Sequence, residues 1–312
     1  MASSFELTIL GSSSATPTSK RHPTAQLLNI AERFFLIDCG EATQIQLRRY
    51  HIRFQRINHI FISHMHGDHY LGLMGLLSSL HLLGRKNPLH LYYPPGLKEV
   101  IELQLEISGT VLNYELFWHP HPETPGIIFE DQLLTVETIT LNHRIPCFGF
   151  IFREKTRAFV INKEAAEAWN VPRSQMMALK HGEDVTLENG TVVPNSALTL
   201  GQRKARSYAF CSDTRFDANV IEAVKGVDLL YHEATFLHEM IERAMATYHT
   251  TAKEAGIVAR EAGVEKLVIG HFSVRYMDLQ PLLDEARAEF PGTALGEEGT
   301  KFSIPEQLIV KK

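Results

Sequence analysis

Short runs of β-branched and aromatic residues recur along the chain and predict ten strands. These runs cover residues 5–10, 25–30, 33–38, 59–63, 89–93, 134–141, 148–152, 207–212, 227–231 and 266–270. A helical pattern covers residues 251–262, with small and apolar side chains on one face and Gly263 as a stop. Early strands follow one another and later ones alternate with helices. We therefore expect an α/β fold built as a layered sandwich rather than a simple doubly wound sheet.

The segment 153–206 breaks this pattern. It has no clean series of strands, and it contains Pro172, Asn189-Gly190 and Pro194. It carries nine Lys and Arg against six Asp and Glu, which makes it +3 inside a chain of formal net charge −5. A structureless stretch of this length is unusual in a compact core, so the segment predicts an insertion or arm that projects from the main domain. The alternative is a solvent-exposed segment that binds no partner.

Composition narrows the class of protein. With 312 residues, 44% of them hydrophobic, the chain can bury a large core, which excludes disorder, collagen and coiled coils. The net charge of −5 argues against a protein coated in positive charge, although a local basic patch stays open. No apolar run reaches the ~18 residues of a membrane helix, the amino-terminal residues do not resemble a secretory signal, and Cys39, Cys147 and Cys211 form no metal-type pair. We expect reduced cysteines and a cytoplasmic location.

The strongest chemical signal is the run Ile60-Phe-Ile-Ser-His64-Met-His66-Gly-Asp68-His69, in a chain with 16 histidines. Three imidazoles and one carboxylate directly follow a predicted buried strand. Residues two apart on an extended chain share a side, so His64 and His66 can hold one ion, and the following turn directs Asp68 and His69 toward a second. No cysteine is placed to complete a structural zinc finger. A chance cluster of surface histidines is the weaker interpretation.

Two metal ions need about seven protein ligands, so others must come from later strand ends. His143 ends the run 138–143, Asp213 follows the run 208–212, and His271 follows the run 267–270. Each residue alone is weak evidence, but their shared position at the carboxyl ends of predicted strands makes them candidates. By contrast, His119-Pro-His121-Pro is flanked by prolines and predicts an extended surface loop without a metal.

With these residues in view, the sequence resembles the metallo-β-lactamase superfamily and, within it, the ribonuclease Z family. The metal motif indicates only the superfamily, and the pieces around Glu233 and His249 favour the family. The resemblance spans nearly the whole chain. It includes Leu10-Gly-Ser-Ser-Ser-Ala-Thr-Pro17, Leu36-Ile-Asp-Cys-Gly-Glu41, Ser212-Asp213-Thr-Arg215, His232-Glu233-Ala-Thr235, His249-Thr-Thr251 and Gly270-His-Phe-Ser-Val274.

The resemblance implies a four-layer αβ/βα sandwich formed by residues 1–312, with a tRNA-binding arm inserted at about 153–206. It implies two Zn²⁺ ions per chain and the activity of a zinc-dependent endoribonuclease, which removes the 3′ trailer from precursor tRNA and leaves a 3′-hydroxyl on the tRNA and a 5′-phosphate on the trailer. It also implies a homodimer in which one subunit's arm presents tRNA to the other's site. The implied ligands are His64, His66 and His143 for one ion, Asp68, His69 and His271 for the other, and Asp213 as the bridge between them.

The implied catalytic residues are Asp68, Glu233 and His249. Asp68 would orient the attacking water and take its proton, while Glu233 would hold His249 in the form that protonates the leaving 3′-oxygen. The chain departs from the family in the arm, which lacks the usual Gly-Pro motif, so docking of tRNA can differ in detail.

Two rival functions stay open at this point. The first keeps the metals but acts on small phosphodiesters, and the basic excess of the arm argues against it because a small substrate needs no distant cationic handle. The second is a metal-binding or RNA-binding module without catalysis. The Glu233 and His249 pair argues against that module, since binding alone does not require a proton donor.

Overall fold

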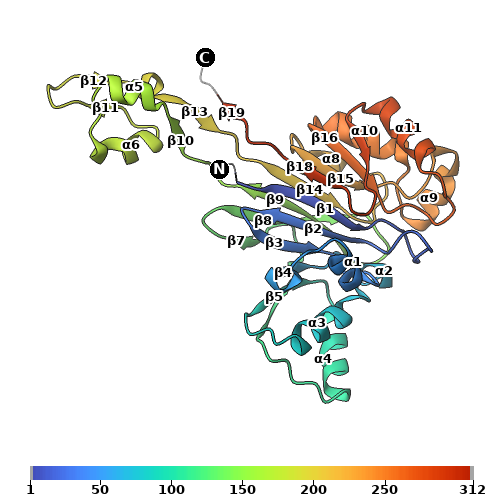
Figure 1. Ribbon diagram of the computed structural model, residues 1–312. Helices are drawn as coiled ribbons and strands as arrows, with labels where there is room; N and C mark the ends of the chain where they lie inside the picture. Colours follow the sequence, from blue (N-terminus) through green and yellow to red (C-terminus); the bar gives the residue numbers. More distant parts are fainter. Residues whose placement is uncertain (1–2, 310–312) are drawn as a thin grey trace.

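Two seven-stranded sheets packed face to face form the centre of the computed structural model, which describes residues 3–309 (Figure 1). Met1 and Ala2, which begin the stretch in which we expected no secretory signal, lie outside the described residues. The first sheet contains, in spatial order, β18 (Lys301–Ser303), β1 (Phe5–Gly11), β2 (Ala25–Ile30), β3 (Arg33–Ile37), β4 (Ile57–Phe61), β5 (Leu89–Tyr93) and β6 (Leu116–Pro120). The second contains β17 (Thr293–Leu295), β16 (Lys266–Gly270), β15 (Leu229–Glu233), β14 (Ser207–Cys211), β9 (Cys147–Glu154), β8 (Leu134–Leu141) and β7 (Ile127–Glu130).

Helices cover the outer face of each sheet, so the predicted four-layer sandwich is confirmed (Figure 1). The first sheet is covered by α1 (Thr43–Arg49), α3 (Leu73–Leu82) and α4 (Leu97–Ile107), and the second by α8 (Ala218–Ala223), α10 (Ala252–Ala262) and α11 (Gln280–Glu289). Short elements in the connections are η1 (Phe54–Arg56), α2 (Gly67–Tyr70), η3 (His238–Met240) and α9 (Ile241–Thr247). Three buried clusters fill the spaces between the four layers.

The hydrophobic runs form these layers because alternate residues of a strand point to opposite faces. Between the sheets the cluster is rich in aromatic rings, such as Phe61, Phe150 and Tyr231. The helix predicted over 251–262 is present as α10. Thr251 and Glu254 close a capping box at its start, and Gly263 ends it with φ +62°. Gly263 adopts this left-handed conformation without the penalty that a side chain would bring.

All ten predicted strands are present, with ends within two residues of the prediction. The largest shifts are in β4 and β15, which were predicted over 59–63 and 227–231. β4 stops at Phe61, and the amide of Ser63 donates a hydrogen bond to the Asp38 carboxylate instead of a neighbouring strand (2.7 Å). The pattern did not predict the edge strands β6, β7, β17 and β18, which are short or partly exposed.

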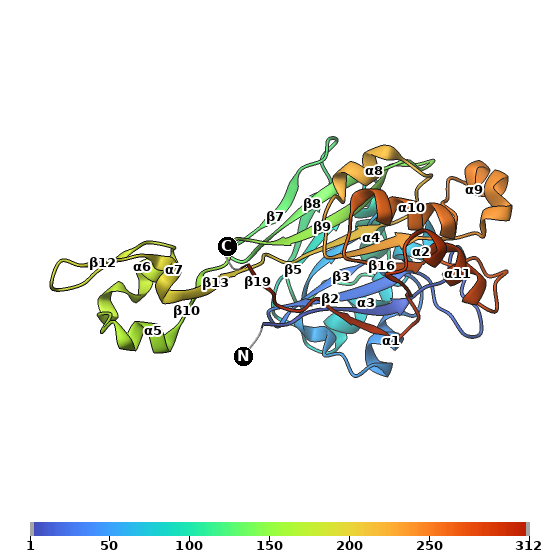
Figure 2. The ribbon, with the colours of Figure 1, turned by 90° about the horizontal axis from the view of Figure 1, so that it is seen from above.

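A separate lobe projects from one end of the sandwich (Figures 1 and 2). It has a small core of its own, which includes Val171, Leu179 and Leu198. We call residues 159–203 the arm. Its elements are β10 (Phe159–Ile161), α5 (Lys163–Ala168), η2 (Arg173–Gln175), α6 (Met176–Lys180), β11 (Val185–Thr186), β12 (Val192–Val193), α7 (Asn195–Leu198) and β13 (Thr199–Arg203), and β19 (Leu308–Ile309) pairs with β13.

The projecting part is shorter than the predicted segment 153–206, and this changes the charge argument. Arg153 lies in β9, and Arg206 is buried in the main fold, where it forms an ion pair with Glu154 (2.7 Å). Lys204 pairs with Asp228 (2.5 Å) and Glu265 (2.6 Å). Part of the +3 excess therefore serves the fold rather than the arm's surface.

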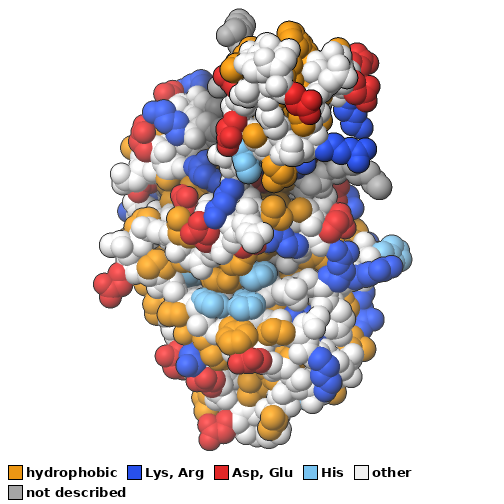
Figure 3. All heavy atoms as spheres, turned by 90° about the vertical axis from the view of Figure 1, so that its left-hand side faces the viewer, with side chains coloured by type: hydrophobic (Ala, Val, Ile, Leu, Met, Phe, Trp, Pro, Cys, Tyr) orange, Lys and Arg blue, Asp and Glu red, His pale blue; other side chains and the backbone are white. Residues whose placement is uncertain are grey.

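Charges of both signs are intermingled on the face seen in Figure 3, which agrees with the expectation from the net charge that the protein has no uniform positive coat. Within residues 3–309, no helix combines the length and the apolar character that crossing a bilayer requires.

Candidate metal centre

Strand ends from both sheets bring the candidate residues together at one edge of the sandwich. β8, β14, β15 and β16 run in the same direction, so their carboxyl ends lie at the same edge of the sheet, with the antiparallel β9 between β8 and β14. At such an edge loops can present polar side chains while the strands stay buried. The structure places His64 and His66 after β4, Asp68 and His69 in α2, His143 after β8, Asp213 after β14, Glu233 at the end of β15, and His271 after β16.

The first group of nitrogens surrounds His66. Its Nδ1 lies 3.1 Å from Nε2 of His64 and 3.1 Å from Nε2 of His143. The Nδ1 of His143 donates to the carbonyl of Tyr248 (3.0 Å), so its Nε2 is left to face the group. Together with Asp213, these three histidines form a set whose ligand atoms could hold one metal ion.

The second group consists of Asp68, His69 and His271. Oδ2 of Asp68 lies 3.5 Å from Nε2 of His69 and 3.3 Å from Nε2 of His271. The same oxygen accepts a hydrogen bond from the amide of Ala15 (2.7 Å), which fixes the position of the carboxylate. This set could hold a second ion.

Asp213 lies between the two groups and presents one oxygen to each. Its Oδ2 is 3.5 Å from Nε2 of His64 and 3.9 Å from Nε2 of His143. Its Oδ1 is 3.4 Å from Nε2 of His69 and 3.2 Å from Nε2 of His271. This is the geometry of a carboxylate that can bridge two cations.

Two orphaned atoms show that the residues fit such ions. Nε2 of His69 and Oδ1 of Asp213 are buried and have no hydrogen-bond partner among the described residues. Buried polar atoms are nearly always satisfied, so these two call for a group that accepts their lone pairs. Imidazole nitrogens with carboxylate oxygens suit a transition metal such as zinc better than magnesium.

Asp38 supports the centre from behind, and sequence reasoning assigned it no role. Its Oδ2 accepts from Nδ1 of His69 (2.6 Å), and both its oxygens accept from Ser63. A carboxylate behind a histidine orients the ring and makes its other nitrogen a better ligand. Asp38 has φ +55°, a conformation that Asp tolerates better than most residues. In the sequence, the only indication of a role for Asp38 was its place in the Leu36-Ile-Asp-Cys stretch.

The carboxylates around His69 also affect its protonation. Burial disfavours the charged ring, but Asp213, Asp68 and Asp38 together raise the pKa of His69 well above its usual range. A protonated imidazole has no lone pair for a metal. Binding of a metal at His69 must therefore release a proton.

Glu233 and His249 form a second unit beside the metal ligands. Glu233 is fully buried, and its Oε1 lies 2.9 Å from Nδ1 of His249. The amides of Thr214, Thr235 and Thr250 donate to the same carboxylate. Burial by itself raises the pKa of a carboxyl group, but the His249 charge and hydrogen bond hold the pKa of Glu233 below its ordinary value.

The effect on His249 has the opposite sign. Burial by itself lowers the pKa of an imidazole, but the charge of Glu233 and its hydrogen bond raise the pKa of His249 to about 9. Thr235 extends this unit toward the metals, because Nδ1 of His271 lies 2.9 Å from Oγ1 of Thr235, which donates to Glu233 (2.7 Å). One buried carboxylate thus orients His249 directly and His271 through a hydroxyl.

The centre opens into a cavity of about 300 Å³. Its walls include the candidate residues His66, Asp68, Asp213, His249 and His271, together with the exposed Arg144. A substrate phosphate could therefore reach both metal groups and His249 from one side.

The expectation that His119 and His121 lie in an extended surface loop was wrong, whereas the absence of a metal there stays a prediction. His119 lies in the edge strand β6 rather than in a loop, and His121 is buried, with Nε2 donating to the carbonyl of Ile62 (2.8 Å). The flanking prolines indicated a loop, but at the edge of a sheet proline costs no ladder hydrogen bond.

Comparisons with known proteins agree with this geometry. Proteins named ribonuclease Z from Bacteroides fragilis (strain YCH46) and Cytophaga hutchinsonii are 46% and 49% identical to this chain, over 96% and 97% of its length and 99% and 97% of theirs. The crystal structure of human tRNase Z, short form, superposes with a TM-score of 0.71 at 26% identity, covering 96% of this chain and 99% of that one.

Two further matches are to a structure of similar fold and to a family model. The metallo-β-lactamase fold protein YhfI from Bacillus subtilis superposes with a TM-score of 0.69 at 16% identity, covering 96% of this chain and 99% of that one. Residues 5–164 match the family model described as Anti-Pycsar protein Apyc1. This match ends at residue 164, near the start of the arm, whereas the relatives above span the arm as well.

Proposed function

This chain belongs to the ribonuclease Z family of metal-dependent endoribonucleases that process the 3′ end of tRNA, and we propose that two zinc ions and the residues of the metal centre carry its reaction. The reaction is hydrolysis of one phosphodiester bond in precursor tRNA. It leaves a 3′-hydroxyl on the tRNA and a 5′-phosphate on the trailer. The observation that carries the proposal is the position of the Asp213 carboxylate, whose two oxygens face separate groups of histidines.

The ligands of the proposed centre follow from this arrangement of the two carboxylate oxygens. His64, His66 and His143 would hold one ion, Asp68, His69 and His271 the other, and Asp213 would bridge them. When bound, the two ions supply Lewis acidity to the scissile phosphate and lower the pKa of the attacking water.

Asp68 would orient the attacking water. His69 and His271 oppose the effect of burial and hold the pKa of Asp68 below its usual range, so its carboxylate is ionised and can accept a hydrogen bond from water. The amide of Ala15 keeps the carboxylate in place.

Proton transfer to the leaving group falls to His249. The attacking water would give one proton to Asp68 as it forms the new bond to phosphorus. The bond from phosphorus to the 3′-oxygen breaks, and that oxygen needs a proton. Nδ1 of His249 is held by Glu233, so its other nitrogen is free to donate. Because Glu233 raises the pKa of His249 to about 9, the ring carries this proton at neutral pH.

We propose that the enzyme is a homodimer and that the arm binds tRNA. In Figure 2 the arm lies at the end of the sandwich away from α2, which carries Asp68 and His69. An arm so far from its own centre is better placed to present tRNA to the centre of a second subunit. We place this activity in the cytoplasm, a proposal supported by the three unpaired buried cysteines.

A labelled precursor tRNA tests the function directly. The purified zinc-loaded protein should make one cut, next to the discriminator base, and Asp68→Ala should lower turnover by several orders of magnitude because it removes both a ligand and the water-orienting carboxylate. Efficient cleavage of a small chromogenic phosphodiester without cleavage of precursor tRNA would favour the alternative, a small-molecule phosphodiesterase.

A further inference from the structure

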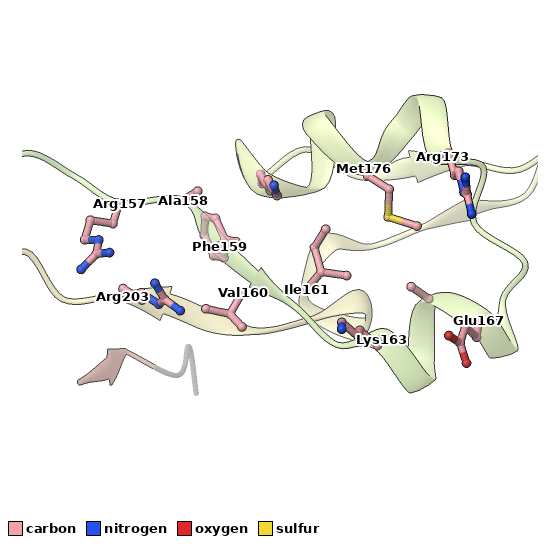
Figure 4. A pocket seen from close by; sticks show the side chains of 12 residues that line it. Arg157, Ala158, Phe159, Val160, Ile161, Lys163, Glu167, Arg173, Met176 and Arg203 are labelled. Carbon is pink, nitrogen blue, oxygen red and sulfur yellow. The ribbon is translucent and has the colours of Figure 1, made fainter. Parts of the chain in front are cut away.

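The arm contains a groove of about 670 Å³, more than twice the volume of the cavity at the metal centre (Figure 4). β10 and α5 form one side of it, and α6 with the turn before it forms the other. We call this the arm groove. Its volume lies within the range of about 300 to 1,000 Å³ that is typical of pockets for small organic groups.

Charge is unevenly distributed over the arm. Residues 157–203, which are the arm and the two residues before it, contain five Lys and Arg and five Asp and Glu, so their net charge is zero. All five cations line the groove, whereas Glu167 is the only one of the five acids that does, so the lining has a net charge of +4. The cations are Arg157, Lys163, Arg173, Lys180 and Arg203.

The five cations differ in what holds them. Arg157 and Arg203 share Glu306, at 2.7 Å and 3.5 Å, which fixes them at the root of the arm. Lys163, Arg173 and Lys180 are exposed and form no ion pair with any residue in the described range 3–309. These three charges are therefore available to an anionic ligand.

The floor of the groove is apolar. Phe159, Val160, Ile161 and Met176 are half-buried and line it between the charged rims. Ile161 and Met176 also pack on the small core of the arm, so the floor has a fixed shape. A floor of this kind offers nothing to a phosphate but suits a flat, weakly polar ring.

Cations around an apolar floor match the chemistry of a nucleotide. In a regular RNA helix the bases are stacked inside, and only phosphates and 2′-hydroxyls can be reached; an unpaired base in a loop can be splayed out and packed against a protein. We propose that the arm groove receives one unstacked nucleotide of the RNA substrate, with its base on Met176 and Phe159 and its flanking phosphates on Lys163, Arg173 and Lys180. This inference rests on the proposed function.

The phosphate contacts can be tested by salt dependence. The variant Lys163→Ala/Arg173→Ala/Lys180→Ala should raise KM for precursor tRNA. It should also make the negative slope of log(1/KM) against log salt concentration less steep by about 2 to 3, since each phosphate contact contributes about 0.7 to 0.9. Turnover of a small chromogenic phosphodiester should be unchanged. The matched control Lys86→Ala/Lys225→Ala/Lys301→Ala, which removes three exposed cations of the sandwich, should keep the slope within about 1 of the intact enzyme.

The base contact needs a second measurement. Precursor tRNAs with one abasic residue, placed in turn at each unpaired nucleotide, should include one that binds roughly 5- to 150-fold more weakly, which is the usual effect of losing one stacked base. For the Met176→Gln variant, the same abasic substitution should weaken RNA binding much less, because the floor of the groove is already altered. An unchanged salt slope in the triple variant would overturn the inference, and so would an abasic effect of equal size in Met176→Gln.

These outcomes are distinct from a failure of the proposed function. If the intact enzyme does not cut precursor tRNA, the function itself is wrong. If the intact enzyme cuts it and the groove variants cut and bind it equally well, only the arm groove inference is wrong.

Discussion

Oε1 of Glu233 lies 2.9 Å from Nδ1 of His249, and three backbone amides hold the same carboxylate in place. The carboxylate cannot turn away without breaking several buried hydrogen bonds. His249 is thus oriented by a rigid partner, and the two residues should act as one unit.

We expect Glu233→Ala and His249→Ala each to slow cleavage of precursor tRNA by roughly 10²- to 10⁴-fold, the usual contribution of a general acid. The double variant should be no slower than the slower single variant, because residues that act as one unit lose most of their function with the first deletion. Single-turnover rates on one labelled RNA would measure this. Losses that multiply would mean that the two residues act separately.

The pH profile should report His249. The residue donates its proton, so activity should be full below its pKa and should fall as the pH rises through it. Glu233 raises the pKa of His249 to about 9, and bound cations oppose this, so the alkaline limb should lie at or below pH 9. Glu233→Gln removes the stabilising charge and should move the limb to lower pH. An unmoved limb would assign it to another group.

The metal content of variants should distinguish the proposed bridging ligand Asp213 from His143, a ligand of one ion only. We expect about two zinc ions per chain in the intact protein, because two groups of ligands meet at Asp213. His143→Ala damages one group and should keep about one ion, whereas Asp213→Ala damages both and should keep fewer. Elemental analysis after gel filtration would measure these contents. No more than one ion in the intact protein, or equal losses in both variants, would contradict the assignment.

Asp38→Asn tests the support behind the metals. Asn also tolerates the positive φ of this position, so the fold should survive. The charge that steadies His69 is lost, and zinc affinity should fall roughly 10- to 100-fold. Competition with a chromogenic chelator would give the affinity, and circular dichroism would check the fold. An unchanged affinity would make Asp38 a purely structural residue.

The dimer proposal predicts complementation between two defective chains. A chain in which a short linker replaces residues 159–203 should lose activity on precursor tRNA but keep it on a small phosphodiester. The Asp68→Ala chain should be inactive on both. Mixing the two under conditions that exchange subunits should restore tRNA cleavage, because the intact arm of one can serve the intact centre of the other. No recovery in demonstrated heterodimers would show that each arm serves its own subunit.

The strands and the first ligands could be predicted because they depend on local pattern. The run before His64 is apolar over consecutive residues, as a strand buried on both faces must be, and the ligands follow within six positions. The sequence also favoured His143, Asp213 and His271, because each comes directly after such a run. These predictions use only neighbours in the chain.

Contacts between residues that are far apart in the sequence were decided by the tertiary structure. Only the packing of two sheets places the oxygens of Asp213 between His64 and His271, and only the turn of backbone at Asp38 aims its carboxylate at His69. The charge count predicted a basic arm, yet folding used Arg206 in a buried ion pair and gathered the arm's own cations around one groove. Composition fixes how many charges a segment has. Which of them neutralise each other is set by distances that exist only once the chain has folded.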